Sequence, residues 1–233
     1  MAAVAWRMSE PARHADLPQG AEFVRLANLR GALTHPVLIW LFALSVLMYG
    51  FSHVTFVFGQ PFILRALDGT WLAGETPVVS GAVTAAMMLT SVAVSMVAPG
   101  LRRRIGLGPL LLLAFAVQVA LPAALILAVG PLAVVLLLSR MVPDALARPF
   151  VLARIQPLLS DDSRATYLSL QSLVGRIAFA ATLWLAARAT TDVGLMSEAE
   201  LRLILGTYAA GGLACLAILA ITATRLAIDP PRR

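Results

Sequence analysis

The stretch PLAVVLLLSRMVPDALARPF, residues 131–150, joins an aliphatic run to a set of charges. Its first half is typical of a helix in hydrocarbon, while its second half carries Arg140, Asp144 and Arg148 at intervals of four. Side chains four residues apart project from nearly the same side of a helix, so Asp144 is able to pair with either arginine. The stretch therefore predicts a membrane helix with one charged stripe, which must face protein or water.

The composition places most of the chain in lipid. Apolar residues make up 60% of its 233 residues and charged residues only 13%, whereas soluble domains carry about a quarter charged residues. The formal net charge is +6, but the basic residues are not gathered on one domain. We therefore expect the lipid bilayer, and no nucleic acid, as a partner.

Six segments are long enough to cross a bilayer, which takes roughly 20 apolar residues. Polar, glycine- or proline-containing connections separate them, as is typical of helix connections. The prediction is an all-α integral membrane protein with one transmembrane domain, residues 37–226, between a polar segment, 1–36, and a tail, 227–233. Part of the polar segment, 21–33, is either a helix on the membrane surface or a linker helix. The six predicted spans are residues 37–64, 77–98, 110–129, 132–153, 165–187 and 203–226.

The distribution of arginine predicts the orientation. Arginine is concentrated in the amino-terminal segment, the second and fourth connections and the tail, while the other three connections are mixed with acidic residues. Arginine-rich connections stay on the cytoplasmic side. Six spans then place both termini in the cytoplasm, and the expected location is a bacterial inner (plasma) membrane.

A buried ion pair is the first candidate feature of a site. A charge near the bilayer centre costs at least ~2.5 kcal/mol unless it finds a partner or water. Counted from the cytoplasmic helix ends, Asp144 and Arg176 both lie roughly 18 Å deep. We therefore predict that Asp144 pairs with Arg140 or Arg176, leaving one positive charge for an anionic substrate or a water-filled cavity. The alternative is that the pair only locks two helices together.

The first predicted span carries a second polar face. Tyr49, His53 and Gln60, with Phe56 between them, follow at helical spacings and form a candidate wall of a substrate pathway. His53 is either a proton acceptor, since imidazole titrates near neutral pH, or a histidine satisfied by one interhelical hydrogen bond. Gln118 in the third predicted span is a further candidate.

Other patterns bear on packing and on chemistry. The small residues of GTYAAGG, residues 206–212, predict close helix packing in the last span. No metalloprotease, nucleophile-elbow, paired-cysteine or phosphate-loop pattern occurs in the sequence. We therefore expect no enzyme activity, no cofactor and no metal.

Three stretches together resemble the major facilitator superfamily of transporters. LTHPVLIWLFALSVLMYGFSHVTFVFGQPFI, from Leu33, is similar to the seventh helix of these proteins, and APGLRRRIG, from Ala98, to the basic turn after the eighth. SRATYLSLQSLVGRIAF, from Ser163, is similar to the eleventh helix and its approach. The resemblance covers residues 33–226, although the basic turn lacks the acidic residue of the fuller family pattern.

The resemblance implies half of a twelve-helix transporter. The chain is similar to the carboxy-terminal six-helix half, and its segment 1–36 resembles the central cytoplasmic loop. The resemblance implies secondary, proton-coupled transport of a small organic or drug-like solute by alternating access. A homodimer, a separately encoded second half and a truncated product that transports nothing all remain open. The other class of explanation is a non-transporting helper or assembly subunit.

Overall fold

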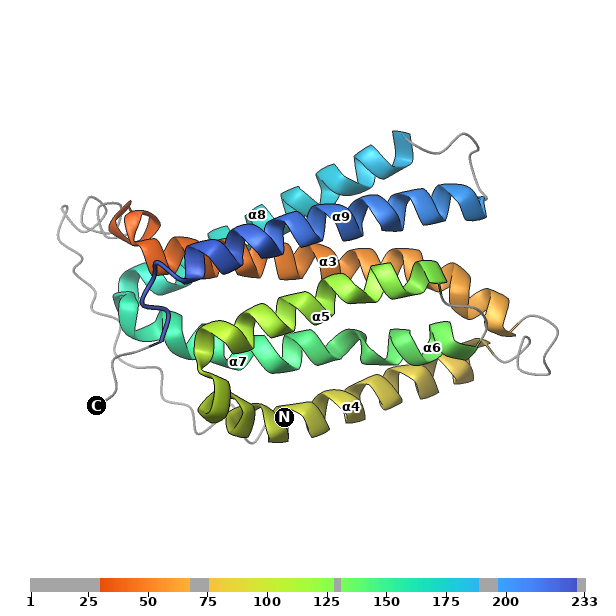
Figure 1. Cartoon of the computed structure of the whole chain (residues 1–233), viewed down its shortest axis with the longest axis horizontal. Coiled ribbons are helices and arrows are strands. Elements are labelled where there is room, and N and C mark those ends of the chain that lie inside the picture. Colours follow the sequence, from red (N-terminus) through yellow and green to blue (C-terminus); the bar gives the residue numbers. More distant parts are fainter. Residues whose placement is uncertain (1–29, 68–75, 128–130, 189–196, 230–233) are drawn as a thin grey trace, which may run out of the picture.

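The computed structural model describes residues 30–67, 76–127, 131–188 and 197–229, and within these ranges the ordered elements are all helices (Figure 1). Apolar side chains cover most of each helix, so the backbone groups must be satisfied within the helix itself. The elements are α3 (Pro36–Leu67), α4 (Thr76–Ile105), α5 (Leu107–Leu127), α6 (Pro131–Leu138), the 3₁₀ turn η2 (Ser139–Met141), α7 (Val142–Ile155), the 3₁₀ turn η3 (Gln156–Leu158), α8 (Asp161–Arg188) and α9 (Glu198–Ala223).

Among the described residues, five helical segments are long and apolar enough to cross a membrane. They correspond to five of the six predicted spans, which confirms an all-α, multi-pass membrane protein. The five are Pro36–Gly59, Gly81–Ile105, Leu107–Leu127, Ser163–Arg188 and Glu198–Ala223.

The predicted span 132–153 is not one α-helix. It is divided into α6 and α7, which lie roughly in line along the bundle with η2 between them (Figure 1). Pro143 explains the division, because proline has no N–H to donate to the carbonyl of Ser139, four residues earlier. The N–H of Val142 donates to the Ser139 carbonyl instead, which tightens the backbone into a 3₁₀ turn.

The described parts of the predicted arginine-rich segments gather at one end of the bundle. The start of α3, the α4–α5 turn, the α7–α8 turn and the end of α9 all lie at the left in Figure 1. At this end Gly106, with φ +88°, ends α4, and Asp229 accepts a hydrogen bond from the N–H of Leu107 at 2.7 Å. Arg154 of α7 donates to the carbonyl of Ile228 at 2.8 Å. The carboxy-terminal segment thus closes the α4–α5 turn and supplies an acidic side chain beside it.

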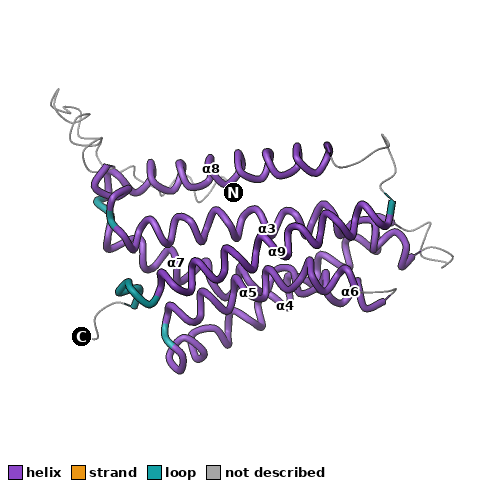
Figure 2. The backbone as a smooth tube through the Cα atoms, turned by 45° about the horizontal axis from the view of Figure 1, so that its top comes forward, coloured by secondary structure: helices purple, strands orange, loops and turns teal. Residues whose placement is uncertain are grey.

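The bundle is built around α5. Half of the α5 span is buried, whereas only 11% of the α4 span and of the α8 span is buried. α5 packs chiefly against α9 and α7, while α8 lies at an edge of the bundle beside α3 (Figure 2). Leu110, Leu111 and Phe115 are fully buried and make the centre of the main apolar cluster.

Polar contacts and small residues fix the neighbours of α3. Trp40 donates from its indole nitrogen to the carbonyl of Leu219 in α9, and Tyr167 of α8 donates from its hydroxyl to the carbonyl of Leu38. A Cβ atom added at Gly212 would lie 2.7 Å from the Phe51 ring of α3. The prediction of close packing through residues 206–212 is confirmed at this glycine. The predicted surface or linker helix, 21–33, lies almost wholly outside the described residues and stays a prediction.

Candidate functional site

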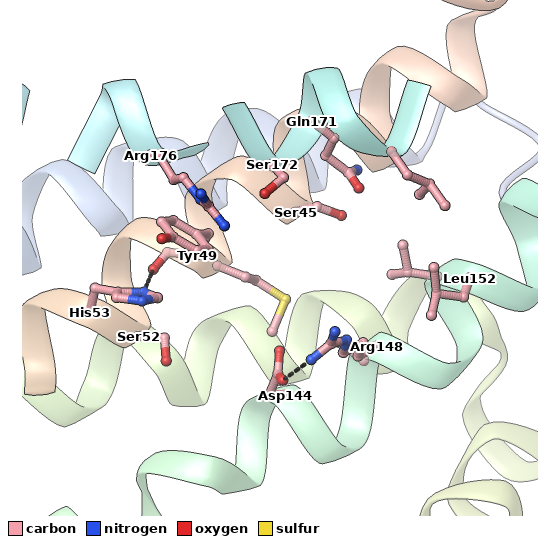
Figure 3. A pocket seen from close by; sticks show the side chains of 14 residues that line it. Ser45, Tyr49, Ser52, His53, Asp144, Arg148, Leu152, Gln171, Ser172 and Arg176 are labelled. Carbon is pink, nitrogen blue, oxygen red and sulfur yellow. Dashed lines mark hydrogen bonds and ion pairs between the residues drawn. The ribbon is translucent and has the colours of Figure 1, made fainter. Parts of the chain in front are cut away.

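A cavity of ≈ 510 Å³ lies between α3, α7 and α8 (Figure 3). Four of the residues predicted for a pathway line it: Tyr49, His53, Asp144 and Arg176. Three helices that are separate in sequence therefore bring their polar faces together. The remaining lining residues are Ser45, Met48, Ser52, Ala147, Arg148, Val151, Leu152, Leu168, Gln171 and Ser172.

The α3 wall is aromatic and polar. Tyr49 and His53, four residues apart, stack with ring centroids 4.0 Å apart. His53 Nδ1 lies 2.8 Å from the carbonyl oxygen of Tyr49, and because a carbonyl only accepts, Nδ1 carries the proton of this bond. The hydrogen bond of His53 is therefore within its own helix, in place of the interhelical bond that was one of the two predicted alternatives, and Nε2 takes no part in it.

The α7 wall is charged, and it corrects the predicted ion pair. Asp144 Oδ2 lies 3.7 Å from Arg148 NH1, one helical turn further along α7. Their side chains are 49% and 74% exposed. The prediction of a buried pair with Arg140 or Arg176 is wrong, because the nearest cation to Asp144 is on its own helix and both groups face an open cavity.

The α8 wall carries the second arginine. Arg176 points from α8 toward Tyr49 in Figure 3, and it makes no ion pair with any described residue. Gly175 lets α8 approach this point closely, since a Cβ atom there would lie 3.2 Å from the Tyr49 ring. Gln171 and Ser172 extend the same wall as neutral hydrogen-bonding groups (Figure 3).

Three further predicted site residues are not part of this cavity as described. The Arg140 guanidinium stacks over the Phe56 ring at 4.7 Å and does not line the cavity. Gln118 is 1% exposed in α5, and neither atom of its amide group has a hydrogen-bond partner among the described residues. Gln60 lies in α3, but its side chain lies outside the described part of the structure.

Four polar lining residues were not predicted from the sequence: Ser45, Ser52, Gln171 and Ser172. Helical spacing was the available signal: Ser45 is four residues before Tyr49, and Ser172 is four residues before Arg176. Serine in a membrane helix often bonds its own backbone, as Ser45 does to the carbonyl of Leu41 at 2.8 Å. Serines alone therefore give a weak signal until the facing helix is known.

The described residues contain no group of three or more His, Cys, Asp or Glu side chains placed to hold a metal ion. No protein-family model, curated protein or solved structure shows significant similarity to the chain. The fold and the cavity together define a class, a multi-pass helical membrane protein with a polar cavity among its helices.

Proposed function

We propose that the chain is a six-span half of a secondary active transporter that moves a small organic or drug-like solute by alternating access. The observation that carries this proposal is the charged cavity between α3, α7 and α8. Its ≈ 510 Å³ lies within the range of about 300–1,000 Å³ typical of small-molecule sites. Charged residues within membrane helices are costly and commonly mark a solute or ion pathway.

The divided helix supports the same proposal. Transporter sites are often formed beside discontinuous helices, whose irregular backbone is tolerated where it lines a cavity. Asp144 follows the η2 turn by three residues, at the start of α7, and lines the cavity. In this reading α6, η2 and α7 together are the sixth crossing of the membrane.

Orientation and partner follow from the same reading. The arginine-rich end of the bundle faces the cytoplasm, which places both termini on the cytoplasmic side of a bacterial inner membrane. Arg176 and Ser172 are exposed on α8, at the edge of the bundle. A membrane protein cannot leave an arginine in contact with hydrocarbon at low cost. A second six-helix half, either another copy or a separate chain, therefore covers this side of the cavity.

Proton coupling is assigned to Asp144 and His53. Both line the cavity, and His53 Nε2 is not used by the bond to Tyr49. A carboxylate and an imidazole that face the same water are able to exchange protons with it as access alternates. An imposed pH step across proteoliposomes should therefore drive solute accumulation, and ATP should not be required.

A cysteine test examines the pathway without knowledge of the solute. In a chain with Cys215 replaced by alanine, Ser172→Cys places a thiol in the cavity, and Val92→Cys places one on an exposed apolar face of α4. A membrane-impermeant methanethiosulfonate should modify the thiol at position 172 and leave that at 92 unmodified, because thiolate forms only in contact with water. If the reagent modified neither thiol, this result would contradict a water-filled pathway.

The helper or assembly subunit remains the second candidate, and the exposed polar side of α8 favours it as much as it favours a transporter half. A measurement of solute flux distinguishes the helper subunit from the transporter half. A reactive thiol at position 172, together with no proton-driven uptake of any solute by the chain or by the chain with its partner half, would support the helper subunit.

A further inference from the structure

We infer that the cavity binds an organic anion, with Arg176 as the contact for its charged group. This inference rests on the proposed function and specifies its substrate class. It starts from the charges that line the cavity, which are Arg148, Arg176 and Asp144. Two guanidinium groups against one carboxylate leave at least one positive charge in excess, since a proton on His53 would only add to it.

The excess charge is located at Arg176. Arg148 has Asp144 as a partner at 3.7 Å, which is within the range of an ion pair but longer than a hydrogen bond. Arg176 has no ion-pair partner among the described residues, although it lies in the middle of α8. A planar guanidinium presents parallel donors that match a carboxylate or a phosphate group. An anion is the ligand that completes this site.

Neutral donors beside Arg176 point to the same chemistry. The Nε2 atom of Gln171 is buried and has no hydrogen-bond partner among the described residues. In Figure 3 the Gln171 side chain extends from α8 into the cavity that Arg176 and Ser172 also line. A buried amide donor without a partner is unfavourable unless a ligand or water supplies an acceptor. The oxygens of an anionic group supply such acceptors.

The rest of the lining indicates that the anion has an organic body. The stacked rings of Tyr49 and His53 form a flat wall, and Met48, Val151 and Leu152 add apolar surface. A cavity of ≈ 510 Å³ is much larger than an inorganic ion, since one water occupies about 30 Å³. A flat or aromatic carboxylate fits both parts of the lining. The headgroup of an anionic lipid offers the same charged chemistry, so the test must separate the two sources.

The test uses 2-naphthoate as the probe and 2-naphthamide as its neutral counterpart. The purified full chain, as its homodimer or together with its separately encoded second half, is placed in nanodiscs of phosphatidylcholine and titrated with each probe by calorimetry. We expect 2-naphthoate to bind at least about tenfold more tightly than the amide, because a hydrogen bond to a charged group is stronger than one to a neutral group. Equal binding of the two probes, or no binding of naphthoate, would overturn the inference.

Two arginine variants on one helix make the matched comparison. Arg176→Gln should weaken naphthoate binding about tenfold or more, to the level of the amide. Arg188→Gln removes the same charge from the end of α8, where the guanidinium stacks on Trp184 at 3.9 Å outside the cavity, and should leave binding unchanged. Equal losses in both variants would show a general charge effect and refute a site at Arg176. If Arg176→Gln does not fold, the comparison of 2-naphthoate with 2-naphthamide still tests whether the cavity binds an anion.

A test with an anionic lipid and a test of transport complete the experiment. Nanodiscs containing phosphatidylglycerol should leave naphthoate binding unchanged, whereas competition by this lipid would assign the site to a headgroup and refute the soluble anion. Proteoliposomes then separate this inference from the proposed function. Naphthoate that binds but is never transported would contradict the transporter and leave the anion site in place. Proton-driven flux of a neutral solute that Arg176→Gln does not alter would contradict the anion site and leave the transporter in place.

Discussion

Asp144→Asn distinguishes a cavity open to water from a dry helix interface. The variant removes one charge of the Asp144–Arg148 pair and keeps the size of the side chain. The pair has a separation of 3.7 Å, one helical turn, and side-chain exposures of 49% and 74%. Exposed pairs contribute about 0.2–1 kcal/mol, and pairs at this helical spacing about 0.3–0.5 kcal/mol. We therefore expect the free energy of unfolding to fall by less than about 1 kcal/mol.

The size of the loss in unfolding free energy distinguishes an exposed ion pair from a buried one. Breaking a buried pair from one side typically costs about 3–5 kcal/mol, because the remaining charge is left without a partner in a low dielectric. Unfolding in mixed micelles, followed by circular dichroism and repeated with Arg148→Gln and the double variant, measures the coupling between the two groups. A loss of about 3 kcal/mol or more would show that the pair is buried and would contradict an open, charged cavity.

A control pair at the first turn of α9, the end of a span, calibrates this measurement. Glu198 and Arg202, at the start of α9, are separated by 2.7 Å and are 59% and 55% exposed. Glu198→Gln should cost as little as Asp144→Asn, if water reaches both pairs equally well. Asp144→Asn should also tighten naphthoate binding, because the excess positive charge of the cavity rises by one.

Three further substitutions test the packing around the site. Gln118→Leu should raise thermal stability, because it removes a buried amide that has no partner, and such a group costs about 1–3 kcal/mol; a lower melting temperature would mean that this amide is hydrogen-bonded. Gly212→Ala should cost about 1–3 kcal/mol in unfolding experiments, since its Cβ atom would lie 2.7 Å from Phe51, whereas Gly211→Ala, with nothing within 4 Å, should cost nothing. Asp229→Ala should cost about 0.5–2 kcal/mol by the same measurement, because the N–H of Leu107 loses its acceptor; Asp229→Asn keeps an acceptor and should recover most of the loss, and equal losses in the two variants would contradict this role.

The sequence by itself determined that the chain is helical, lies in a membrane and crosses it several times. These properties depend on the total hydrophobicity of a stretch of about 20 residues. That total is set by the sequence of the stretch itself and not by the helices that pack against it. Helical spacing likewise placed Tyr49 with His53 and Asp144 with Arg148 on common faces, because a helix repeats every 3.6 residues whatever surrounds it. The charge pattern also predicted which connections lie at the same end of the bundle.

Only the tertiary structure decided which faces meet. Arg140 and Arg176 were equal candidates as partners of Asp144, yet the packing of α8 on α3 takes Arg176 into the cavity, while Arg140 stacks on Phe56. The division at η2 had Pro143 as a signal, but a proline in a membrane helix produces a kink, a break or neither, depending on its surroundings. The rotation and tilt of each helix are set by contacts with residues far away in sequence, and local spacing contains no information about them.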